Sequence, residues 1–118
     1  MFEATSIREW RGHDVRDDGG SKIGQLEAVY VDTATDQPSF GTVQVGLPGR
    51  RRLVFVPLQG ARVGPGYVQV AYDKKLVKEA PSIGTDGELP ATEEEAVFTH
   101  YGLDYAPGAG GERRLARR

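Results

Sequence analysis

Residues 22–32, KIGQLEAVYVD, and residues 53–56, LVFV, are the most informative segments of the sequence. Successive side chains of a β-strand point to opposite faces of its sheet. As strands, Val29-Tyr30-Val31 and Leu53-Val54-Phe55-Val56 therefore place apolar side chains on both faces. One face can line the interior of a small sheet, and the other must be covered from outside by a further element or by a second molecule.

Turn-forming residues divide the first 73 residues into short segments that are rich in Val, Tyr, Phe and Leu. Segments this short, bounded by Gly, Pro and Asp, indicate strands rather than core helices. Gly24, Gly41 and Gly46 suit the bends by which a small sheet closes on itself. We expect a mainly β fold, a small barrel of about five or six short strands. The expected strands are residues 14–16, 22–32, 39–46, 52–57 and 67–72, with a short extended piece at 61–63.

Helical signals replace the strand pattern after Asp73. The Asp73 side chain is placed to cap a short helix over residues 74–80, which Pro81 ends. A second helix begins with Thr92-Glu93-Glu94-Glu95, which matches a capping box whose glutamates we expect in solvent. Gly102 is placed to end that helix in a left-handed conformation. The apolar side of this helix suits it to pack on the outside of the barrel, and it consists of Val97, Phe98 and Tyr101.

Charge is distributed unevenly along the 118 residues, although the formal net charge is only −2. Residues 106–118 carry four arginines and one glutamate, a charge of +3, and the rest of the chain carries 11 basic and 16 acidic side chains, a charge of −5. An acidic body disfavours a broad nucleic-acid surface. The glycine-rich tail has too little apolar content to fold alone, and we expect it to be disordered.

The length fits one compact domain. We expect a barrel over residues 1–81, a linker and the covering helix over 82–105, and the basic tail over 106–118. The absence of cysteine excludes disulfides and zinc–thiolate sites. No apolar run approaches the ~20 residues of a membrane span, and the first residues lack the features of a signal peptide, so we expect a cytoplasmic location.

The order of these elements resembles the PRC-barrel family. The resemblance lies in Trp10-Arg11-Gly12-His13-Asp14-Val15, in residues 22–32 and in Leu53-Val54-Phe55-Val56-Pro57-Leu58, and it covers about residues 7–81. Members include the cytoplasmic part of the photosynthetic reaction-centre H subunit, the C-terminal domain of a ribosome-maturation factor and many short bacterial proteins. The resemblance implies a β-barrel protein-interaction module without a shared active site, and no catalytic residue carries over from it.

Motifs for catalysis, cofactors and metals are missing from the sequence. His13 and His100 are the two histidines, and neither lies in a metal-ligand spacing. We interpret His100 as a cation near the end of its helix. The segment Asp32-Thr33-Ala34-Thr35-Asp36 lacks the glycine and the distal glutamate of a calcium loop, and it is typical of a hairpin turn. We therefore expect no enzyme activity, no cofactor and no bound metal.

Two surfaces are candidates for binding. Arg50, Arg51 and Arg52 start a strand after a Pro-Gly turn, where they could contact phosphate or an acidic partner, although we favour a charged guard on an exposed strand edge. Phe40 is out of phase with the buried valines of its strand, which predicts that it lies outside the barrel. The predicted interaction surface consists of Tyr30, Phe40, Val54 and Val56.

The sequence favours a non-catalytic adaptor that binds protein and acts as a homo-oligomer. We expect a homodimer that uses the surface around Phe40, with the late helix bordering or completing the contact. An unidentified protein is the second expected partner. The alternative function is an RNA- or ribosome-associated assembly factor that uses the arginine clusters, although the acidic body disfavours nucleic acid.

Overall fold

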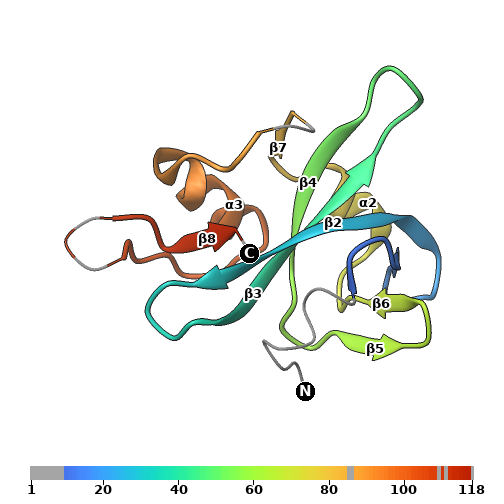
Figure 1. The fold of residues 1–118 in the computed structure, drawn as a ribbon, viewed down its shortest axis with the longest axis horizontal. Helices are drawn as coiled ribbons and strands as arrows, with labels where there is room; N and C mark the ends of the chain where they lie inside the picture. Colours follow the sequence, from blue (N-terminus) through green and yellow to red (C-terminus); the bar gives the residue numbers. More distant parts are fainter. Residues whose placement is uncertain (1–9, 85–86, 109, 111, 118) are drawn as a thin grey trace.

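The computed structural model describes residues 10–84, 87–108, 110 and 112–117. The fold is mainly β, as expected (Figure 1). The strands are β1 Asp14–Arg16, β2 Lys22–Asp32, β3 Gln37–Val45, β4 Arg52–Pro57, β5 Arg62–Gly64, β6 Tyr67–Gln69, β7 Ser82–Ile83 and β8 Leu115–Arg117. The helices are α2 Lys74–Lys78, the 3₁₀ turn η2 Ala91–Glu93, and α3 Glu94–His100. The predicted bounds of β1, β2 and β4 are confirmed, whereas β7 and β8 were not predicted.

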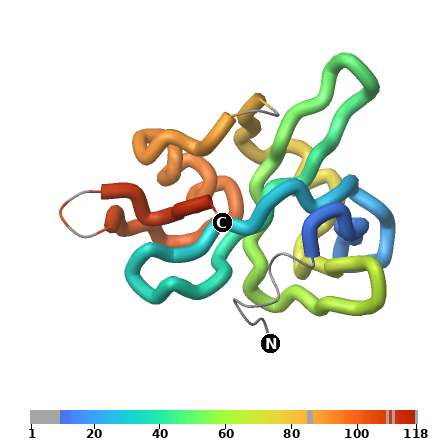
Figure 2. The backbone as a smooth tube through the Cα atoms, in the orientation of Figure 1, coloured from blue at the N-terminus to red at the C-terminus, as the bar shows by residue number. Residues whose placement is uncertain are grey.

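The strands form one sheet in the order β5-β6-β1-β2-β3-β4-β7. Within the described residues this path stays open, so the pairings do not confirm the closed barrel. β2 pairs with β3 along one edge, while its other edge pairs first with β1 and then, at Tyr30 to Asp32, with β8. The C-terminal segment therefore lies beside the end of β2, far from it in sequence (Figure 2).

Both faces of the central strands are buried. Thr42 pairs with Phe55 and Val43 with Val54, so Phe55 and Val54 point to opposite faces of the sheet. Phe55 and Val54 are each 0% exposed. Tyr30 and Phe40, which pair with each other, share the face of Phe55, and the rings of Tyr30 and Phe55 lie 5.0 Å apart. The prediction that these strands need a cover on their second face is confirmed.

The protein's own C-terminal part supplies that cover. The Phe98 ring of α3 lies 5.0 Å from the Phe40 ring, and the Tyr101 hydroxyl donates a hydrogen bond to the carbonyl oxygen of Phe55. Burial raises the pKa of Tyr101, so this hydroxyl keeps the proton that it donates. Gly102 has φ +69° and ends α3, with the Leu103 N–H donating to the Phe98 carbonyl, which confirms the predicted left-handed end.

Phe40 is only 1% exposed, because α3 covers it. The prediction that it lies on the second face of the sheet is correct, but the prediction of an exposed interaction surface is wrong. The other members of that surface are also inside, since Tyr30 is 1% exposed and Val54 and Val56 are 0% exposed. An arginine at position 40 would place an unpaired charge in this core, so that substitution cannot separate association from folding.

Glu94 joins α3 to the C-terminal strand. Its side chain is 0% exposed, and its carboxylate accepts hydrogen bonds from the backbone N–H groups of Arg114 (2.9 Å) and Leu115 (2.8 Å) and from the Tyr105 hydroxyl (2.7 Å). The bond to Glu94 raises the pKa of Tyr105 to about 12, which keeps its hydroxyl protonated as a donor. A buried carboxylate is stable here because N–H and O–H donors surround it.

Two predictions about this region are wrong. The chain enters α3 through η2, whose N-cap is Pro90, so Thr92 makes no cap and Glu94 points inward rather than into solvent. The tail is not disordered in its described part, because Leu115 is 0% exposed and β8 pairs with β2. Composition alone does not reveal that the buried Glu94 carboxylate accepts hydrogen bonds from the backbone of the tail and so orders it.

The short helix α2 forms as predicted. The Asp73 carboxylate accepts the Lys75 N–H at 3.0 Å, and the buried Val77 packs the helix against the sheet. None of the helices in the described part of the chain is long and apolar enough to cross a membrane.

We predict that Glu94→Gln lowers the free energy of unfolding by about 2 kcal/mol. Glutamine has an NH₂ group in place of one carboxylate oxygen, so a buried backbone N–H loses its acceptor. Urea unfolding followed by the fluorescence of Trp10 measures the change. Glu95→Gln, at the neighbouring exposed position, is the control and shifts the free energy by less than about 0.5 kcal/mol. Equal effects of the two substitutions would contradict the role of Glu94.

Candidate functional site

A groove of about 700 Å³ lies at the end of the sheet where β3 begins. It is lined by residues 37–40, by residues 57–61 and by Leu103 and Asp104, together with Asp32, Phe98 and Arg114. The start of β3, the turn after β4 and the end of α3 build it. We call it the groove.

Apolar side chains form the inner part of the groove and polar groups form its rim. Phe40 and Leu58 are buried, Leu103 is half-buried, and Gln37, Gln59 and Asp104 are exposed. At one end, the guanidinium Nε of Arg114 donates to the Asp32 carboxylate at 2.7 Å. This mixture is typical of a surface that binds another molecule.

The groove lining does not hold an arrangement for acid–base or nucleophilic catalysis. Its titratable side chains are Asp32, Asp104 and Arg114. Asp32 is committed to Arg114 and also accepts the Ala34 N–H at 2.8 Å, as in the predicted hairpin turn. A catalytic site needs a nucleophile or a base held by a partner near a reacting position, and these residues do not supply one.

A second hollow, of about 530 Å³, lies beside the hairpin between β3 and β4. Its lining includes Lys22, Arg51 and Lys78, and no carboxylate is part of it. The Arg51 guanidinium donates to the Gln44 side chain at 3.2 Å, and the Arg52 guanidinium donates to the Lys78 carbonyl at 2.7 Å. We call this site the basic hollow. Arg50 and Arg51 are exposed beside it, whereas Arg52 is half-buried.

The arginines of the tail are bound within the chain. Arg113 lies 3.7 Å from the Glu88 carboxylate, Arg114 pairs with Asp32, and Arg117 pairs with Glu27. Each tail arginine that the structure describes therefore has a carboxylate partner in the protein. The described partners of Arg51 and Arg52 are, in contrast, the neutral Gln44 side chain and the Lys78 carbonyl group.

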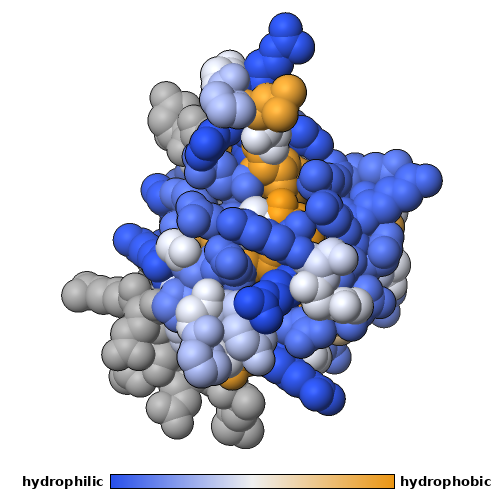
Figure 3. Space-filling model, turned by 90° about the vertical axis from the view of Figure 1, so that its right-hand side faces the viewer, coloured by the Kyte–Doolittle hydropathy of each residue, from blue (hydrophilic) through white to orange (hydrophobic). Residues whose placement is uncertain are grey.

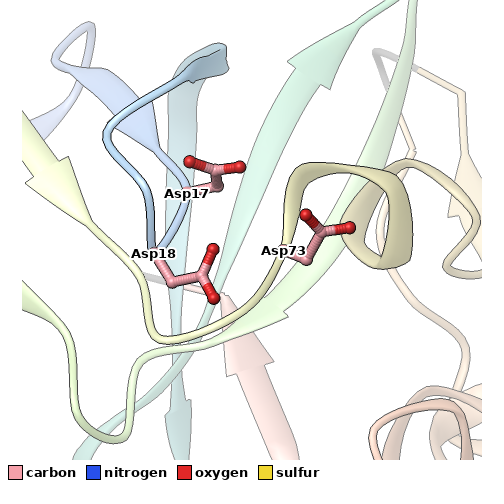
Figure 4. A group of neighbouring side chains, drawn as sticks. All are labelled: Asp17, Asp18 and Asp73. Atoms are coloured by element: carbon pink, nitrogen blue, oxygen red, sulfur yellow. The ribbon is translucent and has the colours of Figure 1, made fainter.

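Three carboxylates, those of Asp17, Asp18 and Asp73, come within 4.8 Å of one another (Figure 4). Backbone N–H groups are the hydrogen-bond partners of two of these carboxylates, those of Asp17 and Asp73. The Asp17 carboxylate accepts the N–H groups of Ser21 (2.8 Å), Gly19 (3.0 Å) and Lys74 (3.2 Å), and Asp73 caps α2. The cluster holds the turn after β1 against the start of α2.

The two histidines lie in different parts of the fold. His100 lies at the end of α3, as predicted, and its Nε2 is 2.7 Å from the Leu76 carbonyl oxygen. The contact ties α3 to α2. His13 belongs to the turn before β1, where its carbonyl accepts the Leu26 N–H.

Two of the residues that the sequence indicates as binding candidates line a hollow: Arg51 lines the basic hollow, and Phe40 lies in the inner part of the groove. The sequence did indicate that a strand ends at Pro57 and that a helix ends at Gly102. The sequence does not indicate that the end of β4 and the end of α3 lie beside the same groove, because this depends on how α3 packs on the sheet.

Comparison with known proteins identifies the N-terminal two thirds of the chain. The sequence profile of the PRC-barrel domain matches residues 2–77. No curated protein matches the chain. The matched region ends inside α2, so β7, α3, β8 and the groove residues on α3 and the tail lie beyond it.

We predict that Asp17→Asn lowers the free energy of unfolding at about pH 7 and changes it less as the pH falls below 3.8. The N–H of Ser21 lowers the pKa of Asp17 most; burial opposes the shift, and the N–H groups of Lys74 and Gly19 add to it. A lowered pKa gives stability that is complete above 3.8 and is lost as the pH falls through the folded-state pKa.

Urea unfolding of the wild type and the variant at about pH 7 and about pH 3 measures this difference. Asp18→Asn, at the exposed neighbouring position, serves as the control and has little effect at either pH. The interpretation fails if the gap between the wild type and Asp17→Asn is the same at both pH values.

Proposed function

This chain is a member of the PRC-barrel domain family, and we propose that it is a non-catalytic adaptor whose groove binds a segment of a partner protein. The observation that carries the proposal is the groove itself, an apolar hollow with a polar rim that lies beside the core without being closed by the chain. Family membership also supports a barrel as the architecture of the N-terminal part.

The occupant that fits the groove is an extended polypeptide segment. A volume of about 700 Å³ holds a few side chains. Phe40, Leu58 and Phe98 offer apolar contacts for such side chains. Gln37, Gln59 and Asp104 can form hydrogen bonds to the backbone of the segment at the rim.

Self-association is part of the proposal, since a second copy of the chain is itself a protein partner. The surface first expected to mediate it is buried, so a homo-oligomer would use the groove or another exposed surface. A cytoplasmic location fits such an adaptor.

The alternative is an RNA- or ribosome-associated assembly factor. The exposed Arg50 and Arg51 beside the basic hollow favour it. The ion pairs of the tail arginines weigh against it, because Arg113, Arg114 and Arg117 already have carboxylate partners. No aromatic ring on which a base could stack lines the basic hollow.

We predict that Gln59→Arg removes the partner that the wild-type protein captures from a native lysate, because the longer charged side chain enters the groove. Thr92→Arg, at an exposed position of η2 that lines neither the groove nor the basic hollow, is the control and retains the partner. Both captures are repeated after nuclease treatment, and the adaptor function predicts that the partner remains.

Loss of the partner after nuclease would favour the RNA-associated alternative, and equal capture by the two variants would remove the groove from the proposal. Light scattering on the same proteins tests self-association. A mass of 12.8 kDa at micromolar concentration would show a monomer and would contradict the homo-oligomer.

A further inference from the structure

The hairpin between β3 and β4 projects from the body of the protein (Figure 1). Leu47 lies in its turn and is 73% exposed, the larger exposure of the two large hydrophobic residues exposed in the described chain. Arg50 and Arg51 follow it and are also exposed. In the side view, the projecting end carries hydrophobic surface among strongly hydrophilic residues (Figure 3). We call Leu47, Arg50 and Arg51 the hairpin tip.

The turn fixes how the tip is presented. The Arg50 N–H donates to the Leu47 carbonyl at 2.8 Å, and Gly46 has φ +102°. A Cβ atom at Gly46 would lie 2.5 Å from the Arg50 carbonyl oxygen, so the turn requires glycine at this position. A tight turn of this kind holds Leu47 in solvent while the arginines stay beside it.

The basic hollow continues from the tip along the same side of the protein. Lys22 and Lys78 join Arg51 in its lining, and among the residues that the structure describes the only carboxylate paired with these three groups is that of Asp14, 3.4 Å from Lys22. Arg52 binds the Lys78 carbonyl and so attaches α2 to the start of β4. The result is a local positive surface on a chain whose net charge is −2.

We propose that the hairpin tip and the basic hollow bind the surface of an anionic lipid bilayer. Leu47 enters the interface between headgroups and acyl chains, and Arg50, Arg51 and Lys78 contact lipid phosphates. The attraction is confined to this surface, because the net charge of the chain is negative and an anionic bilayer repels the rest of the protein. This inference goes beyond the proposed adaptor function and uses a surface separate from the groove.

The composition of the surface favours a bilayer over the other anionic partners. Binding of single-stranded RNA relies on aromatic side chains that stack on bases, and the basic hollow has none. A stable protein interface needs an extended apolar centre, and the tip offers Leu47 alone. A bilayer needs no matching apolar surface, because the insertion of one aliphatic side chain adds to the attraction of adjacent cations for anionic headgroups.

Sedimentation of the 118-residue chain with lipid vesicles tests the proposal. We expect binding to vesicles of phosphatidylcholine with about 30% phosphatidylglycerol, no binding to phosphatidylcholine alone, and weaker binding as salt rises. Arg50→Ala combined with Arg51→Ala lowers the partition coefficient about 30-fold, since each cation near the surface contributes about fivefold. Leu47→Ser lowers it at unchanged charge.

β5 provides matched controls, because Arg62 and Val63 are also exposed and Val63 is 43% exposed. Arg62→Ala and Val63→Ser retain vesicle binding. The proposal is overturned if the tip and β5 variants bind alike, if binding does not depend on phosphatidylglycerol, or if an RNA oligonucleotide binds the tip and removes the protein from vesicles. Gln59→Arg leaves vesicle binding unchanged, so failure here is distinguishable from failure of the adaptor function.

Discussion

The strands β2 and β4 carry apolar side chains on both faces, and this constraint determines the rest of the structure. A small sheet can bury one face in its own interior, but the second face carries Tyr30, Phe40 and Phe55 and requires a cover. α3 provides it, and the buried carboxylate of Glu94 joins α3 to β8, which pairs with the edge of β2. The cover lies beyond the region that matches the PRC-barrel domain.

This cover also determines which surfaces remain for binding. Because α3 occupies the second face, Tyr30 and Phe40 belong to the core, and Val54 and Val56 are buried on the opposite face. The groove lies where the end of α3 meets the start of β3 and the turn after β4, so its walls come from both the family domain and the C-terminal part. The hairpin tip lies at the opposite end of β3, where α3 does not cover it, so the Leu47 side chain stays in solvent.

The features predictable from the sequence are those fixed by neighbours along the chain. The alternation of side chains in residues 22–32 and 53–56, the cap at Asp73 and the glycine end at Gly102 each depend on local geometry, and the structure confirms them. Glu94 shows the limit of such reasoning, because three consecutive glutamates are typical of a solvated helix start. Its burial depends on amide donors about 20 residues away, which composition does not reveal.

Hydrogen exchange at the backbone amides of Arg114 and Leu115, followed by NMR in the 118-residue chain, tests most directly whether the C-terminal segment is held permanently against α3 and the sheet. The account predicts that these amides exchange as slowly as those of β3 and β4, through global unfolding alone. Exchange close to the rate of an unstructured peptide, while β3 and β4 stay protected, would show that the sheet does not depend on this cover and would contradict the account.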